Sequence, residues 1–173
     1  QHATAYKFLA TMTRKGRGGI VADPLEARRL LRQGAERDDR YAQYELGAEL
    51  VALPAPQEQA EGIAWLNKAV QLGWPQIQLL LGLAHRDGTG VPRDYTQARA
   101  WLVKAAAQSL PKAQYALAVL TEQGLGGARN ETEALTLYQK AAARGIPDAA
   151  LRLADAAAQG ELGIPVDPAK AAE

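Results

Sequence analysis

The chain has 173 residues and an almost even charge balance, with 20 basic and 19 acidic side chains and a net charge of +1. This balance argues against a nucleic-acid-binding protein, which normally carries a basic surplus on one face. The chain has no cysteine, which excludes disulfides and thiolate metal sites, and no apolar run approaches the ~20 residues of a membrane-spanning helix.

Two apolar landmarks recur along the chain with nearly the same period. A leucine followed by glycine or alanine returns at intervals of 37, 35, 36 and 36 residues, at Leu9, Leu46, Leu81, Leu117 and Leu153. A second pair falls between these at intervals of 35, 36 and 36, starting at Leu30, Trp65, Trp101 and Leu137. Two landmarks per period of about 36 residues, in a composition rich in helix formers, predict stacked helix pairs.

The period divides the chain into repeats at about 5–41, 42–76, 77–112 and 113–148, with a partial repeat at 149–173. We expect an all-α solenoid of about four and a half repeats, with nine helices, no strand, and one domain over 1–173. The chain starts at Gln1 without methionine, and a second helix predicted from Asp167 breaks off at Glu173. We therefore expect a segment of a longer repeat protein, whose downstream sequence should raise the melting temperature.

Boundary residues support these helix pairs. Asp94 with Gln97, and Asn130 with Glu133, have the spacing of a capping box at the start of a second helix. Second helices are expected to end at Gly73, Ser109 and Gly145, each followed two residues later by proline. Glycine costs about 1 kcal/mol inside a helix, so Gly47 and Gly82 imply close packing of a neighbouring helix.

The motifs of the third repeat resemble a known family. The elements Leu81-Gly82, then Gly88 to Tyr95, then Ala98 to Ala106, are similar to the Sel-one-like repeat, a relative of the tetratricopeptide repeat. The fourth and fifth repeats fit well, whereas the first two are degenerate. The resemblance implies a right-handed superhelical αα solenoid with an adaptor or scaffold role, often in bacterial envelope, secretion or host-contact systems. It favours a periplasmic or exported location and leaves the cytoplasm open.

Residues for catalysis or metal binding are scarce. The chain has two histidines, His2 and His85, and its single serine, Ser109, stands at a predicted helix end. The glycine-rich loops that begin at Gly88 and Gly124 follow helices instead of strands, and they lack the lysine of a phosphate-binding loop. Helix termination therefore explains these glycines. We therefore expect no catalytic residue, no cofactor, no metal ion, no nucleic acid and no membrane insertion, and no enzymatic activity.

The resemblance also points to a binding surface. In tetratricopeptide-like folds the first helices line the concave face, and the corresponding positions here form an apolar and aromatic strip with a charged edge. These candidate partner-binding residues are Tyr44, Leu79, Leu83, Arg86, Tyr115, Val119 and Glu122. Aromatic anchors with a polar rim suit a protein-binding groove, although Tyr44, Leu79 and Tyr115 could equally pack against neighbouring helices.

The main hypothesis is a non-enzymatic, bacterial interaction scaffold that binds a peptide segment or a protein on its concave face. The alternative is an inhibitory or immunity-type protein that blocks an enzyme or a secreted effector, through the loops or the convex surface. The identity of the partner and the oligomeric state are left open by the sequence.

Overall fold

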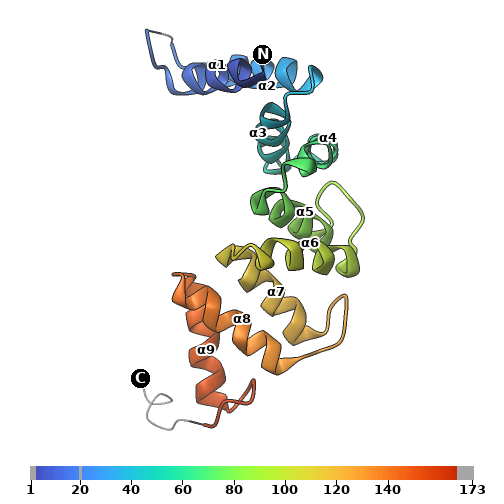
Figure 1. Ribbon diagram of the computed structural model, residues 1–173, viewed down its shortest axis with the longest axis vertical. Helices are drawn as coiled ribbons and strands as arrows, with labels where there is room; N and C mark the ends of the chain where they lie inside the picture. Colours follow the sequence, from blue (N-terminus) through green and yellow to red (C-terminus); the bar gives the residue numbers. More distant parts are fainter. Residues whose placement is uncertain (1–2, 20, 167–173) are drawn as a thin grey trace. The chain divides into compact units, whose positions relative to one another are not determined.

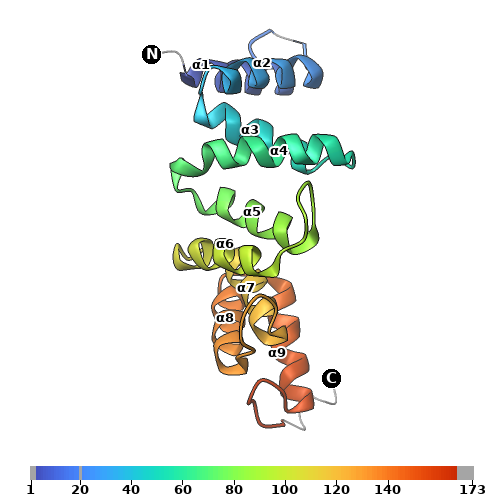
Figure 2. The same ribbon diagram turned by 90° about the vertical axis from the view of Figure 1, so that its right-hand side faces the viewer.

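The computed structural model describes residues 3–19 and 21–166, and within these ranges it contains nine α-helices and no strand, as predicted. The first helices of the five repeats are α1 (Ala3–Lys15), α3 (Arg40–Val51), α5 (Pro75–Asp87), α7 (Pro111–Gln123) and α9 (Pro147–Gln159). The second helices are α2 (Pro24–Glu36), α4 (Pro56–Ala69), α6 (Tyr95–Ala107) and α8 (Glu131–Ala143). A short 3₁₀ turn, Val70–Leu72, extends α4. Figures 1 and 2 show the order of the helices.

The helices form two compact units. The first comprises Gln1–Ile77 and the loop Gly88–Pro92, and the second comprises Gln78–Asp87 and Arg93–Glu173. The single domain expected over 1–173 stays a prediction, and the helix expected from Asp167 lies outside the described residues.

In the first unit, α1 packs along α2, α2 contacts α3, and α3 packs along α4 (Figure 1). Their apolar stripes meet in one core that contains the landmark residues Leu31 and Leu46, which are at most 2% exposed. Leu66 of α4 is also fully buried. A leucine at each crossing removes apolar surface from water without placing a polar atom in the interior.

In the second unit, α7 contacts both α6 and α8, and α8 contacts α9 (Figure 1). One core cluster joins Leu102 of α6 to Leu117 and Leu120 of α7. A second cluster is centred on Tyr138 of α8, which is 1% exposed and takes the place that leucine has in the earlier repeats.

The starts of α2, α6 and α8 are each tied to the end of the helix before them. The carboxylate of Asp94 accepts hydrogen bonds from the N–H groups of Thr96 and Gln97 at 2.9 and 3.0 Å, so the predicted cap forms. The other half of the capping box does not form, because the Asp94 N–H is donated to the carbonyl oxygen of His85 at 2.8 Å. Asn130 makes the equivalent bond to Thr121 at 3.1 Å. This backbone bond closes the hairpin within the repeat.

Small residues let a first and a second helix approach closely. A Cβ on Gly47 of α3 would lie 2.8 Å from Cγ of Leu66 and 2.9 Å from the carbonyl oxygen of Gly62 on α4. A Cβ on Gly62 would in turn lie 2.8 Å from the carbonyl oxygen of Gly47. The close packing inferred for Gly47 is therefore a contact between the backbones of α3 and α4, which leaves no room for a side chain.

This contact reverses the usual effect of alanine in a helix. Gly47→Ala should lower the free energy of unfolding by about 1–3 kcal/mol, because the added methyl group meets backbone that cannot move aside. Urea unfolding followed by circular dichroism measures the change. The exposed Ala64→Gly in α4 is the propensity control and should cost about 1 kcal/mol. An unchanged or more stable Gly47→Ala would contradict the close contact.

The turn after each second helix places one residue in the left-handed region. Gly73 and Gly145 have φ values of 68° and 82°, and Ser109 occupies the same place with φ 60°. A residue with a Cβ is strained there. Ser109→Gly should therefore stabilise the protein by about 0.5–1 kcal/mol. This is the net effect, because the relief of strain exceeds the entropy that glycine adds to the unfolded chain.

Thermal unfolding of Ser109→Gly and of the control Ser109→Ala measures this effect. Only the glycine variant should melt at a higher temperature, because alanine keeps the Cβ that causes the strain. A gain of the same size in both variants would mean that the serine hydroxyl, and not the φ angle, limits stability.

Candidate functional site

The first helices of the second unit line a surface cleft of about 310 Å³. It lies where α5, α7 and the start of α9 come together. The lining residues are Leu79, Leu83, Arg86, Lys112, Tyr115, Ala116, Ile146, Pro147 and Asp148.

Helical spacing makes the floor and walls of this cleft apolar. Leu79 and Leu83 are four residues apart on α5, so they share one face of the helix. Leu79 is 9% exposed and forms the floor, whereas Leu83, Tyr115 and Ile146 are half-buried and keep part of their surface open. The Tyr115 ring also packs against the Tyr138 ring, with their centroids 5.9 Å apart. One face of the Tyr115 side chain is therefore open to a partner, and its other side is held by the core.

Charged groups stand at the rim of the cleft. The Arg86 guanidinium donates two hydrogen bonds to the carboxylate of its neighbour Asp87, at 2.7 and 2.8 Å. This interaction with Asp87 outweighs the effect of burial and raises the pKa of Arg86. Lys112 in the first turn of α7 and Asp148 in the first turn of α9 are both exposed. The cleft thus combines an apolar interior with charges of both signs at its edge.

The cleft brings together four of the seven candidate residues: Leu79, Leu83, Arg86 and Tyr115. Val119 is half-buried on α7 one turn beyond Tyr115 and packs against the α8–α9 core. Tyr44 belongs to the first unit, where its ring contacts the Trp74 ring edge-on at 5.4 Å. Burial and Glu45 raise the pKa of Tyr44.

Sequence reasoning missed the wall of the cleft that precedes α9. Ile146 directly precedes the helix, and Leu110 and Trp74 hold the same place 36 and 72 residues earlier. An apolar residue before each of these prolines was therefore a visible signal. Trp74 contacts Tyr41 and Tyr44, and Ile146 packs in the cluster that contains Tyr115. Trp74 before α5 and Ile146 before α9 thus each cover the preceding first helix.

Glu122 takes part in a network that joins α7, α8 and α9. Its carboxylate accepts a hydrogen bond from the hydroxyl of Tyr138 at 2.6 Å and is paired with the guanidinium of Arg152. Arg152 also donates to Glu161 at 2.8 Å. Burial acts to raise the pKa of Glu122, but the hydrogen bonds from Arg152 and Tyr138 outweigh it, and the pKa is lowered. The network fixes α9, whose first turn forms one wall of the cleft.

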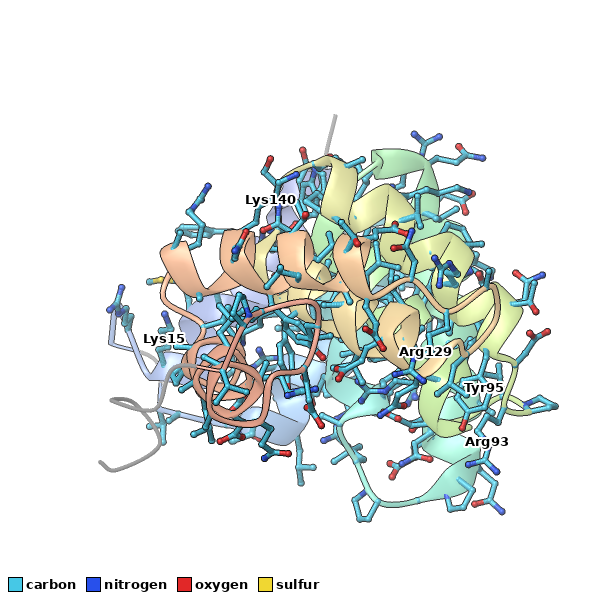
Figure 3. All side chains as sticks on the ribbon, turned by 90° about the horizontal axis from the view of Figure 1, so that it is seen from below. Lys15, Arg93, Tyr95, Arg129 and Lys140 are labelled. Carbon is cyan, nitrogen blue, oxygen red and sulfur yellow. The ribbon has the colours of Figure 1, made fainter. Side chains whose placement is uncertain are left out.

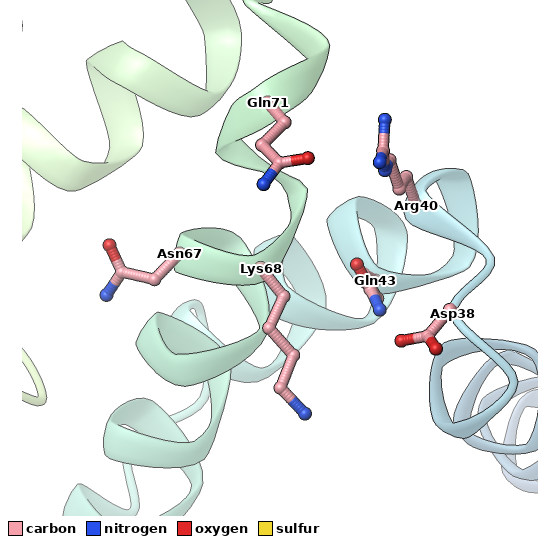
Figure 4. Close-up of a pocket in the computed structure, with 6 residues that line it drawn as sticks. All are labelled: Asp38, Arg40, Gln43, Asn67, Lys68 and Gln71. Carbon is pink, nitrogen blue, oxygen red and sulfur yellow. The ribbon is translucent and has the colours of Figure 1, made fainter.

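The first unit carries a polar pocket of about 440 Å³ (Figure 4). Its lining residues come from the start of α3 and the end of α4: Asp38, Arg40, Gln43, Asn67, Lys68 and Gln71. Two of these side chains already have internal contacts. The Gln43 amide donates to the carbonyl oxygen of Ala35 at 3.1 Å, and the Lys68 amine lies 4.2 Å from the centroid of the Trp65 ring. The pocket has no apolar anchor point and is the weaker candidate.

The described residues offer little for catalysis. Ser109 is exposed in the turn after α6, and His85 lies on α5 with Nδ1 buried and without a hydrogen-bond partner. Within residues 3–19 and 21–166, no three histidine or acidic side chains are grouped closely enough to hold a metal ion. No helix in the described part of the chain is long and apolar enough to cross a membrane.

Fold and cleft together define an αα-repeat protein with an apolar surface cleft between its first helices. The Sel1 repeat matches five consecutive segments, residues 3–39, 40–74, 75–110, 111–146 and 147–173, and the chain belongs to the Sel1 repeat family. Each segment begins two residues before the repeat expected from the sequence. Proteins of this family generally mediate protein–protein interactions and act as scaffolds without enzymatic activity.

Two solved structures are similar to the chain. One is a protective antigen of uropathogenic Escherichia coli with an SLR fold, at 28% identity and a TM-score of 0.84. The alignment covers 95% of this chain and 35% of the antigen, so the chain spans about a third of that protein. The other is a Sel1 repeat protein from Oxalobacter formigenes, at 24% identity and a TM-score of 0.83, with 98% of this chain and 67% of the other covered. No curated protein matches the chain.

The lowered pKa of Glu122 predicts how stability depends on pH. The network stabilises the fold above the ordinary glutamate pKa of about 4.5, and this contribution is lost as pH falls through the lower pKa of the folded state. Glu122→Gln should therefore lower the free energy of unfolding at pH 7 by about 1–2 kcal/mol, because it removes charge-assisted hydrogen bonds. Urea titrations between pH 3 and pH 7 measure this.

The two proteins should converge in stability as the pH falls through the lowered pKa of Glu122 in the folded state. Glu131→Gln is the matched control, because Glu131 forms an ion pair with the exposed Arg129 at the surface and such pairs contribute little. A constant difference between Glu122→Gln and the original chain from pH 7 to pH 3 would show that ionisation of Glu122 does not stabilise the fold.

Proposed function

We propose that the protein is a non-enzymatic interaction scaffold that binds a peptide segment or a protein partner in the cleft between α5, α7 and α9. The observation that carries this proposal is that the cleft collects Leu79, Leu83, Arg86 and Tyr115 in one place with part of each wall open. Val119 and Glu122 remain candidates for an extension of this surface within the second unit, and Tyr44, in the first unit, remains a separate candidate contact residue. Protein–protein interaction is typical of the family. The scaffold role in a bacterial system is the more specific function that we propose.

The residue types suit binding energetically. Tyrosine and arginine are over-represented among the residues that dominate protein interfaces, because each combines a large contact area with a directional polar group. Tyr115 and Arg86 have both properties, and Tyr115 is also held in position by the Tyr138 ring. Little conformational entropy is then lost when a partner binds. Truncation of either side chain should weaken binding by about 2 kcal/mol, roughly thirtyfold in affinity.

Photo-crosslinking tests the location of the site. A photoreactive phenylalanine derivative replaces Leu83 in the cleft, or Val103 on α6 as the control, in cells of the source organism. Val103 is 46% exposed and outside the cleft, so both probes reach the surface but only one faces the proposed partner. Crosslinks from position 83 alone, abolished by Tyr115→Ala or Arg86→Ala, are expected.

The helical spectrum and melting temperature of each variant are measured alongside, so that loss of fold is not taken for loss of binding. The inhibitory or immunity-type alternative predicts a different pattern. In that case a probe at Thr89 or Leu125, in the loops between the helices of a repeat, would crosslink the partner while the probe at position 83 would not. That outcome would contradict the cleft proposal and favour the alternative.

A further inference from the structure

Lys112 differs from Arg86, the other cation that lines the cleft, in having no acidic partner among the described residues. Arg86 is paired with Asp87. Lys112 is exposed at the rim, beside the apolar wall formed by Tyr115 and Ile146. A partner group that approached this wall would therefore meet a cation that no internal carboxylate neutralises.

The lining of the cleft carries two cations, Arg86 from α5 and Lys112 from α7, and one carboxylate, Asp148 from α9. The Arg86–Asp87 pair joins adjacent surface residues, and the Asp87 side chain is 46% exposed, so a partner carboxylate can exchange with it at little cost. Asp148 lies in the first turn of α9, where the positive end of the helix dipole offsets much of its charge. The uncompensated charge of the cleft is therefore positive.

We propose that the occupant of the cleft is a peptide segment in which a large apolar side chain is flanked by aspartate or glutamate. The apolar side chain fills the space between Leu83, Tyr115 and Ile146, and the carboxylate pairs with Lys112 and Arg86. This inference rests on the proposed function, since it concerns the same cleft. Burial of the apolar anchor removes water from the rim, which strengthens the charge pairing beside it.

Peptide selection tests the chemistry directly. Random dodecapeptides displayed on phage are selected on the full chain, and sequences that also bind the Leu83→Lys variant are discarded. Tyr115→Ala serves as a second filter if Leu83→Lys does not keep the helical spectrum. The expected result is a set of peptides that share a leucine, phenylalanine or tryptophan next to one or more acidic residues.

Charge variants then test the pairing, with one selected peptide as the probe. Lys112→Gln should weaken its binding about two- to fivefold, and Asp148→Asn should strengthen it by a similar factor, because a like charge is removed. Lys140→Gln is the matched control. Lys140 is an exposed lysine of α8 that is outside the cleft lining (Figure 3), and its loss removes the same net charge. An increase in salt from 50 to 500 mM should reduce the Lys112 effect.

The outcomes separate this inference from the proposed function. Cleft-dependent peptides that are basic or uncharged would overturn the acidic partner and leave the cleft as a peptide site. Equal losses in Lys112→Gln and Lys140→Gln would also overturn it, because the effect would then follow net charge alone. A dimer that Leu83→Lys dissociates would make a second copy the occupant. A selection that yields no cleft-dependent peptide would overturn both the inference and the proposed function.

Discussion

The close approach of a first helix to a second helix is the contact on which the rest of the structure depends. In the first unit the backbones of α3 and α4 meet at Gly47 and Gly62, where even one methyl group would lie within 3 Å of backbone atoms. In the second unit Gly82 of α5 faces Leu102 of α6, and a Cβ would lie 2.8 Å from the leucine Cγ. The small residue sets how deep the facing leucine lies, and the leucine in turn fills the core between the helices.

The hairpin within each repeat adds directional bonds to this non-directional packing. A backbone N–H at the cap of the second helix donates to a carbonyl oxygen near the end of the first helix, at Asp23, Asp94 and Asn130. The second repeat lacks this cap. There α4 begins at Pro56, which needs no partner for an N–H group, and the Gln59 amide donates to the carbonyl oxygen of Leu53 at 2.8 Å. The hairpin is thus closed in two chemical ways, which allows the loop to vary in sequence.

The cleft follows from the same repeat geometry. First helices present one face on which Leu79 and Tyr115 hold the same place in successive repeats, and the apolar residue before the next helix closes the space at one end. What distinguishes the second unit is the Glu122–Tyr138–Arg152 network, which fixes α9 against α7 and α8. The Tyr138 hydroxyl reaches this network because its ring occupies a core position that leucine holds in the other repeats. The stability of the last repeat and the shape of the cleft therefore have a common origin.

The sequence by itself determined the number of helices, their order, and the residues that face the core, because apolar residues recur with the period of a helix and caps mark the boundaries. Through the family resemblance it also suggested a strip of seven residues, of which Leu79, Leu83, Arg86 and Tyr115 line one cleft. Only the tertiary structure decided which charges are already paired. Glu122 and Arg152 are 30 residues apart in the chain, and nothing in the local pattern of either predicts that they meet. Likewise, only the packing of three helices places Lys112 beside an apolar wall, because a contact between distant segments depends on how the helices stack and not on the propensity of any one of them.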